Sequence, residues 1–185
     1  MAILKIARMG NPVLRAIAAP IEDPTDPKWA RLVDDMRDTL VDIHANGLAA
    51  PQVHVSKRLV LYRVAGHQIP LGSAMKPVPW TVLINPVIAP LSEETKLIWE
   101  RCLSVPGLHG QVPRYTHVGC EAKGLKGEHI AVEARGFYAS LLQHECDHLD
   151  GVLYPMRMTD MSSLSFNSEL GDRGFFMPRP PSEFD

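Results

Sequence analysis

Hydrophobic side chains recur at spacings of three and four residues between positions 27 and 44, a pattern that predicts an amphipathic helix. Asp26 and Pro27 open this stretch, and an aspartate followed by proline is typical of a helix N-cap and first turn. The apolar positions are Trp29, Leu32, Val33, Met36, Leu40 and Ile43. We expect this face to pack against the core and the helix to end near residues 44–46.

Four further segments have the composition of β-strands. Residues 58–64 and 81–88 are rich in β-branched and aromatic side chains and are bounded by turn-forming prolines and glycines. Residues 117–122 and 128–133 flank a glycine-containing stretch at residues 123–127, and this arrangement predicts a β-hairpin.

A second helix is expected over residues 136–149. Its apolar positions, at helical intervals, are Phe137, Leu141, Leu142 and Leu149. Asp150 and Gly151 follow directly and supply a C-terminal stop.

The order of these elements favours an α+β fold, in which antiparallel sheets surround the second helix. Residues 1–25 are punctuated by prolines and are expected to form an extended N-terminal arm ahead of the first helix. A chain of 185 residues has room for one compact domain, here residues 1–185, with a C-terminal tail from about residue 160.

Composition and charge exclude several classes of protein. A hydrophobic fraction of 45% and a charged fraction of 22% are ordinary for a globular domain and do not fit a disordered or fibrous chain. A net charge of −2 gives no reason to expect direct binding of nucleic acid or of an anionic membrane. The sequence has no signal-peptide pattern, no membrane-spanning apolar run and only 3 cysteines, so we expect a cytoplasmic protein.

The expected second helix carries a His-Glu-x-x-His motif. His144 and His148 are four residues apart, so both imidazoles lie on one helix face and can bind one metal ion. Glu145 is rotated about 100° from His144, close enough to act on water at the metal without being a ligand. The simpler interpretation, a polar helix face with two unrelated histidines, needs no metal.

A catalytic site of this kind needs a third protein ligand. Zinc peptidases take it from a downstream histidine or glutamate, but no histidine follows Gly151, and the two glutamates there have no supporting pattern. Cys120 lies in an expected strand and is interpreted as a small buried side chain. Cys146 is rotated about 200° from His144, away from the metal face. Cys102, between a strand and a turn, is therefore the best candidate for a thiolate ligand.

A loop at residues 45–52 places small side chains ahead of one glutamine. Small residues such as Gly47 allow close backbone approach, and the Gln52 amide can donate a hydrogen bond. By itself this pattern is more often that of a structural loop.

Taken together, the three stretches resemble the peptide deformylase family. The signature of that family is a G-x-G-L-A-A-x-Q loop, an E-G-C-L-S segment and a Q-H-E-x-D-H helix, in this order. This sequence has Ala-Asn-Gly-Leu-Ala-Ala-Pro-Gln at residues 45–52, Glu-Arg-Cys-Leu-Ser at residues 100–104 and Gln-His-Glu-Cys-Asp-His at residues 143–148. The resemblance extends from residues 13–15 to residues 149–154 and so covers most of the chain.

The resemblance implies an enzyme that removes the N-formyl group from the formylmethionine of nascent polypeptides and releases formate. Cys102, His144 and His148 would bind one divalent metal ion, usually Fe(II) in this family, with Zn, Ni or Co able to replace it. Water activated at the metal would attack the formyl carbon, and Glu145 would take its proton and pass it to the leaving amine.

The resemblance also assigns the residues that hold the substrate. The Gln52 side chain, the Leu103 backbone N–H and the metal would bind the oxyanion. Gly47 would let an extended peptide run alongside the loop by backbone hydrogen bonding. A pocket for the methionine side chain would be lined by Leu48, Leu103, Phe137 and Leu141.

Two positions depart from the family's pattern. Ala45 replaces the first glycine of the loop, which costs about 1 kcal/mol if the position requires a positive φ. Arg101 replaces the glycine before Cys102, and we expect an active enzyme with altered substrate reach. Asp147 and Arg114 resemble the structural ion pair that steadies the metal helix in this family.

Two other functions stay open at the level of sequence. A zinc endopeptidase would use the same His-Glu-x-x-His motif, although Cys102 and the missing downstream ligand argue against it. A decayed relative would be a metal-stabilised binding module whose site is narrowed by Arg101 and Ala45. A transient ribosome partner is implied because nascent chains carry the formyl group, but no basic helix after Met158 suggests a docking element.

Overall fold

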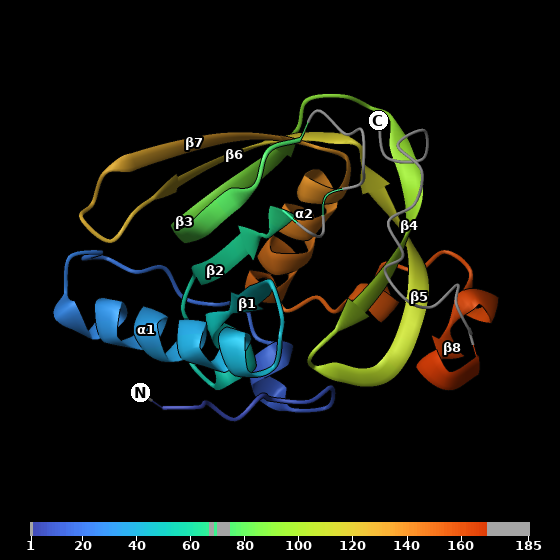
Figure 1. The fold of residues 1–185 in the computed structure, drawn as a ribbon, viewed down its shortest axis with the longest axis horizontal. Coiled ribbons are helices and arrows are strands. Elements are labelled where there is room, and N and C mark those ends of the chain that lie inside the picture. Colours follow the sequence, from blue (N-terminus) through green and yellow to red (C-terminus); the bar gives the residue numbers. More distant parts are fainter. Residues whose placement is uncertain (1, 67–68, 70–74, 170–185) are drawn as a thin grey trace.

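Two antiparallel sheets lie on either side of helix α2 (Gly136–Leu149) in the computed structural model of the protein (Figure 1). The structure describes residues 2–66, 69 and 75–169. The larger sheet has the strand order β1-β2-β3-β6-β7, and the smaller one has the order β4-β5-β8. Helix α1 (Pro27–Asp42) packs on the other face of the larger sheet. The predicted α+β fold with a central second helix is confirmed.

The strands of the larger sheet are β1 (Gly47–Ala49), β2 (Leu59–Val64), β3 (Val78–Pro90), β6 (His117–Lys123) and β7 (His129–Arg135). Those of the smaller sheet are β4 (Thr95–Cys102), β5 (Val105–Tyr115) and β8 (Ser165–Phe166). Single 3₁₀ turns occur at η1 (Pro12–Leu14), η2 (Ala50–Val53), η4 (Tyr154–Met156), η5 (Met161–Ser163) and η6 (Asn167–Glu169). Within the described chain, β1 and β4 are end strands, so each has one open edge.

Helix α1 begins where the sequence predicts. The Asp26 side chain accepts a hydrogen bond from the Lys28 N–H (2.9 Å), which satisfies a free donor of the first turn. The helix ends at Asp42, slightly earlier than expected, because the chain turns through His44 with a φ of 51°. Four of the predicted apolar positions are buried: Trp29, Val33, Met36 and Leu40.

Alternation along β2 divides the core of the protein in two. Val60 and Tyr62 face α2 and pack with Leu142 of that helix. Leu59 and Leu61 face the opposite way and pack with α1. Because successive side chains of a strand point to opposite faces, a strand covered on both sides has a nearly continuous apolar sequence.

The N-terminal arm is held against the domain by side-chain and backbone hydrogen bonds. Asn85 interrupts β3 with a φ of 52°, and its amide accepts from the Ile21 N–H (2.9 Å) and donates to the Ile21 carbonyl (2.8 Å). Nearer the start, the Met9 N–H donates to the Ser104 carbonyl (2.7 Å). The arm is therefore extended as predicted, and it reaches the turn between β4 and β5.

The structure adds elements that the sequence did not predict. Strands β1, β5 and β8 were not expected, and β4 was expected only as a strand of unspecified length before Cys102, whereas the predicted hairpin of β6 and β7 is confirmed. Leu108 and His109 of β5 pair with Phe166 and Ser165 of β8. Part of the segment expected to be a tail therefore belongs to a sheet, and residues 170–185 lie outside the described residues. No helix in the described part of the chain is long and apolar enough to cross a membrane.

Candidate metal centre

The predicted ligands Cys102, His144 and His148 lie together. Their ligand atoms are all within 4.8 Å of one another, and Cys102 Sγ is 3.4 Å from His148 Nε2. The two imidazole rings are nearly perpendicular, with centroids 4.9 Å apart. A tetrahedral ion with ordinary Zn–S and Zn–N bond lengths separates its sulfur and nitrogen donors by about 3.6 Å. The three donor atoms therefore fit one metal ion.

A tight turn brings the thiol to the helix. Cys102 is the last residue of β4 and pairs with Val105, the first residue of β5, so only Leu103 and Ser104 lie between the strands. The Ser104 N–H donates to Cys102 Sγ (3.4 Å), which favours the thiolate. The third ligand thus comes from the smaller sheet, whereas the other two come from α2.

Burial and neighbouring charges shift the pKa values of the ligands Cys102 and His144 in opposite directions. Burial by itself raises the pKa of the Cys102 thiol, but His148 and His144 lower this pKa well below its ordinary value. Burial by itself lowers the pKa of His144, but its contacts with Cys102 and Glu100 raise this pKa well above its ordinary value. The cysteine is therefore held as a thiolate, the form that binds metals.

Glu100 orients the imidazole of His144. Its Oε2 accepts from His144 Nδ1 (2.7 Å), which leaves Nε2 for the metal. Arg114 donates to both oxygens of the same carboxylate, at 2.6 Å and 3.0 Å. Burial raises the pKa of Glu100, but His144 and Arg114 lower it to about 2, so the carboxylate is ionised. Its position two residues before Cys102, on the same face of one strand, is the sequence signal that indicates this role.

Asp147 extends this network to the surface. Arg114 Nη1 donates to Asp147 Oδ2 (2.7 Å), so the ion pair expected from the resemblance is present. Arg157 donates to both oxygens of Asp147 from the outer side (2.7 Å and 3.3 Å). Because Asp147 stands between the two histidine ligands in sequence, these contacts fix the C-terminal half of α2.

Glu145 is buried beside the ligands with one oxygen free of partners. Its Oε2 has no hydrogen-bond partner among the described residues. Burial raises the pKa of Glu145 to about 7, because the nearby charges of His144 and His148 offset only part of the cost of burying a carboxylate. This carboxyl group is therefore poised to exchange a proton near neutral pH.

Gln52 contacts the Cys102 thiol. It belongs to η2, directly after β1, and its Oε1 accepts from the Ala49 N–H (2.9 Å). Its Nε2 donates to Ser104 Oγ (3.2 Å) and to Cys102 Sγ (3.5 Å). The structure thus brings the predicted oxyanion donor to the metal centre.

The predicted methionine-pocket residues do not share one surface. Phe137 and Leu141 are seven and three residues before His144, so they lie on the same face of α2 as that ligand. Leu103 is partly buried and packs against the core between the larger sheet and α1.

Leu48 is fully buried in that same core. On β1 it alternates with Gly47, whose α-carbon faces Glu145, so the Leu48 side chain points to the opposite side of the strand. The prediction that Leu48 lines a pocket beside the metal is therefore wrong.

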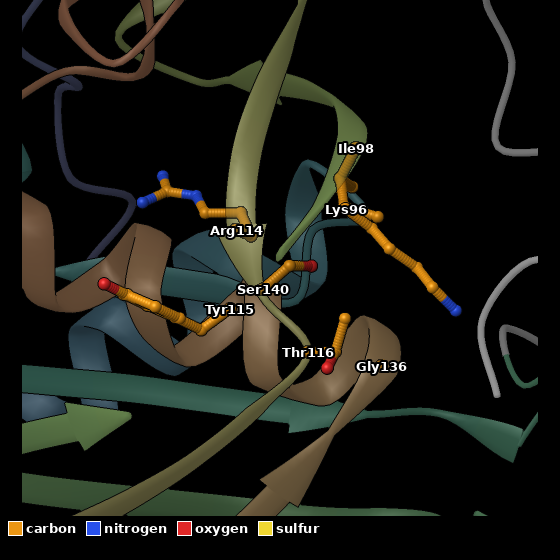
Figure 2. A pocket seen from close by; sticks show the side chains of 7 residues that line it. All are labelled: Lys96, Ile98, Arg114, Tyr115, Thr116, Gly136 and Ser140. Carbon is orange, nitrogen blue, oxygen red and sulfur yellow. The ribbon is translucent and has the colours of Figure 1, made fainter. Parts of the chain in front are cut away.

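A small cavity lies between β4, β5 and the first turns of α2 (Figure 2). Ile98 is on the same face of β4 as Glu100, and Ser140 is one helical turn before His144, so the cavity adjoins the metal centre. The sequence pattern assigns neither residue to the site. The complete lining is Lys96, Ile98, Arg114, Tyr115, Thr116, Gly136 and Ser140.

The two departures from the family signature have simple structural consequences. Arg101 is exposed, while its neighbours Glu100 and Cys102 are buried, so its side chain lies on the face of β4 away from the ligands. Ala45 does not adopt a positive φ, and in this loop His44 does so instead. The backbone strain that a positive φ at Ala45 would have caused is therefore absent.

The remaining cysteines are not part of the ligand cluster. Cys120 is buried as predicted, and Cys146, also buried, is not grouped with the three ligands although it lies between the two histidines in sequence.

Comparison with known proteins gives consistent matches along the chain. The family model described as polypeptide deformylase matches residues 3–163. Peptide deformylase 1 of Bordetella pertussis is 45% identical over 166 residues, which cover 89% of this chain and 93% of that protein. Peptide deformylase 1 of Prochlorococcus marinus is 41% identical over 174 residues, which cover 94% of this chain and 90% of that protein.

Solved structures agree with these matches. The class I type b peptide deformylase of Acinetobacter baumannii, in its crystal structure with bound Met-Ala-Ser, has a TM-score of 0.76 and 34% identity, covering 85% of this chain and 100% of that one. The peptide deformylase of Thermotoga maritima has a TM-score of 0.76 and 31% identity, and the match covers 86% of this chain and 100% of that one.

Proposed function

The chain belongs to the peptide deformylase family, and we propose that Glu145, Gln52 and Leu103 carry out deformylation beside its Cys-His-His centre. The protein is a metal-dependent hydrolase that removes the N-formyl group from the N-terminal formylmethionine of nascent polypeptides and releases formate. The observation that carries the assignment of residues is the buried Glu145 carboxyl group, with a free oxygen, beside three converging ligand atoms.

Cys102, His144 and His148 would hold the metal, for which we propose Fe(II), with Zn, Ni or Co able to take its place. When bound, such an ion polarises a carbonyl group and lowers the pKa of water in the site. One thiolate and two imidazoles bind any of these ions, so the donor set is compatible with each of them. Metal analysis of protein purified without oxygen tests the identity of the ion.

Glu145 is proposed as the group that moves the proton. Its carboxylate would take a proton from the attacking water and deliver it to the nitrogen of the departing methionine. A pKa of about 7, raised by burial, suits both the acceptance and the donation of a proton. The water adds to the formyl carbon, the C–N bond breaks, and the products are formate and a free amino terminus.

The oxyanion is proposed to be bound by the Gln52 side chain and the Leu103 backbone N–H. Gln52 Nε2 already points to Cys102 Sγ, and Leu103 follows that cysteine in the chain, so both donors border the metal centre. Donors fixed in place before the reaction stabilise the developing negative charge most effectively.

The peptide is proposed to lie along the open edge of β1. Gly47 has no side chain to obstruct an extended chain, and an unpaired strand edge offers backbone hydrogen bonds without regard to sequence. Phe137 and Leu141, on the same face of α2 as His144, are proposed to contact the methionine side chain. Met-Ala-Ser, which the Acinetobacter baumannii protein binds, is the peptide that deformylation of formyl-Met-Ala-Ser leaves behind.

The test is formate release from formyl-Met-Ala-Ser by nickel-loaded protein, compared with Glu145→Ala. We expect the variant to retain one metal per chain and to lose at least about 10²-fold in kcat. Glu22→Ala, an exposed glutamate remote in sequence from the motifs, is the matched control and should keep full activity. No turnover by metal-loaded wild type would favour a decayed binding module, and cleavage of casein would favour a peptidase.

We also propose a cytoplasmic location and a transient association with ribosomes. The formyl group is present on nascent chains, so an enzyme that removes it works where those chains emerge. Co-sedimentation with translating ribosomes tests the association, and recovery of all the protein in the supernatant at low salt would contradict it.

A further inference from the structure

The Gln52 amide is held at both ends in the structure. Its Oε1 accepts from the Ala49 N–H (2.9 Å), so only the nitrogen can face the other way. The nitrogen donates to Ser104 Oγ (3.2 Å) and to Cys102 Sγ (3.5 Å). Gln52 and Ser104 are both almost completely buried, at 2% and 0% exposure, so water does not compete for these bonds.

Ser104 is itself fixed by three contacts. Its N–H donates to Cys102 Sγ (3.4 Å), and its carbonyl accepts from the Met9 N–H (2.7 Å). Its hydroxyl oxygen accepts from Gln52. The short turn between β4 and β5 therefore links the metal ligand, the N-terminal arm and the Gln52 side chain.

The two hydrogens of Gln52 Nε2 have unequal acceptors. One is directed to an oxygen, whereas the other faces sulfur, which accepts hydrogen bonds weakly. An oxygen that develops negative charge next to Cys102 is a stronger acceptor than sulfur and would take over the second hydrogen. Ser104 would keep the first hydrogen and hold the plane of the amide fixed while this exchange occurs.

We propose that Ser104 is a positioning residue for deformylation: its hydroxyl holds the Gln52 amide so that the remaining N–H points to the formyl oxygen. This inference rests on the proposed role of Gln52. Without the hydroxyl, the Gln52 nitrogen keeps the Cys102 sulfur as its acceptor among the described residues, and the amide can turn away from the oxyanion. The Ser104 hydroxyl contacts Gln52, whereas only the backbone N–H of Ser104 reaches Cys102 Sγ, so loss of the hydroxyl would act on the reaction through Gln52.

The first experiment is a double-mutant cycle with Ser104→Ala and Gln52→Ala in nickel-loaded protein. Ser104→Ala is expected to lower kcat about tenfold with KM unchanged, because the donor is misplaced rather than removed. In the Gln52→Ala background the same change should have less than about a twofold effect. A purely structural serine would lower kcat by the same factor in both backgrounds, and that result would overturn the inference.

Ser163→Ala is the matched control. The Ser163 hydroxyl donates to the Asp160 carbonyl (2.9 Å) and accepts from the Gln111 N–H (3.2 Å), so the substitution also removes a serine that bridges two segments. We expect its kcat to equal that of the wild type. Ser104→Thr, which retains a hydroxyl group, is expected to recover most of the kcat that Ser104→Ala loses.

The second readout is independent of catalysis. The chain has four glutamines, so zinc-loaded protein labelled with ¹⁵N-glutamine shows only four side-chain amide groups, and Gln52→Ala identifies the one that belongs to Gln52. Ser104→Ala should speed hydrogen exchange of the Gln52 amide at least about tenfold, and Ser163→Ala should leave it unchanged. An unchanged exchange rate in Ser104→Ala would overturn the inference. If Gln52→Ala itself retained wild-type kcat, the proposed role of Gln52 would be wrong, and the positioning role of Ser104, which depends on it, would be wrong as well.

Discussion

The α-carbon of Gly47 lies so close to the Glu145 carboxylate that a β-carbon at position 47 would be 2.1 Å from Oε1 and 2.7 Å from Cδ. No side chain fits at these distances unless the carboxylate moves. The absence of a side chain at position 47 therefore defines where the proton-transferring group stands, in addition to leaving room for a peptide along β1.

Gly47→Ala should displace the Glu145 carboxylate without unfolding the protein, because the side chain that must move is flexible. We expect kcat for formyl-Met-Ala-Ser to fall about 10²-fold, a typical contribution of a general base, with unchanged metal content. Gly66→Ala is the control, since among the described residues its β-carbon would meet Pro77 Cγ at an ordinary 3.5 Å. A kcat of Gly47→Ala within threefold of wild type would contradict the prediction, because it would show that the Glu145 carboxylate still functions after making room for the added methyl group.

Glu100→Ala should weaken metal binding, because it removes the acceptor for His144 Nδ1 and one of the two carboxylates that the Arg114 guanidinium contacts, the other being Asp147. Loss of such an outer contact typically lowers metal affinity by about 10- to 100-fold, and a broken buried ion pair costs about 3–5 kcal/mol of stability. Competition with a chelator and denaturant titration measure the two effects.

Arg157→Ala is the matched control for Glu100→Ala. Arg157 contacts the same network through Asp147, but its side chain is 49% exposed, so solvent screens the interaction. We expect less than about 1 kcal/mol of destabilisation and no measurable change in metal affinity. Equal effects of the two substitutions would mean that the network acts on stability alone and does not orient His144.

The stability of the metal-free protein should depend on pH through Glu145. Burial raises the pKa of Glu145 in the folded protein to about 7 from 4.5, so the folded state binds this proton more tightly than the unfolded state does. The free energy of unfolding should therefore decrease by about 3 kcal/mol as the pH rises from 4.5 to 7, and the contribution should be constant outside this range.

Glu145→Gln has no proton to lose and should abolish this part of the pH dependence. Denaturant titrations at pH 5 and pH 8, in the presence of a chelator, give the difference between wild type and variant. Glu22→Gln, an exposed substitution, should leave the wild-type slope in place. The same slope in Glu145→Gln as in wild type would assign the effect to other groups.

Arg101→Gly should change substrate reach and leave the metal site intact. The Arg101 side chain lies on the face of β4 opposite Cys102, so the variant should retain its metal. An exposed cation on the strand that supplies Cys102 would favour peptides with an acidic residue after the methionine through its long-range field, by a factor that falls with added salt. We expect the ratio of kcat/KM for formyl-Met-Asp to formyl-Met-Lys peptides to decrease in the variant; identical ratios would exclude a role for Arg101 in substrate choice.

Local features of this protein follow from the sequence alone. Helix α1 starts at Pro27 because Asp26 caps it, and the spacing of His144 and His148 places both imidazoles on one face of any helix. The hairpin of β6 and β7 is equally local, since its strands are joined by a short glycine-containing turn. Each of these depends on residues only a few positions apart, whose geometry the backbone largely determines.

Other features depend on how distant segments pack. Cys102 was the best candidate for the third ligand, but its place beside His148 depends on the pairing of β4 with β5 and on the position of the smaller sheet against α2. Leu48 was assigned to the α2 side of β1 although it packs on the α1 side. A strand of three residues between small residues does not show which of its faces contacts which helix. The fold also decided the contacts of Glu100 and Ser104.

The sequence by itself therefore determined the chemistry of the metal centre: a thiolate, two imidazoles and a carboxyl group in a known order along the chain. Tertiary structure alone decided that the carboxyl group stands against Gly47, that Glu100 orients His144 and that Ser104 holds Gln52. The physical reason is that residue type and near-neighbour spacing specify donors and acceptors, whereas the distances between them arise only when two sheets close around one helix and bury them together.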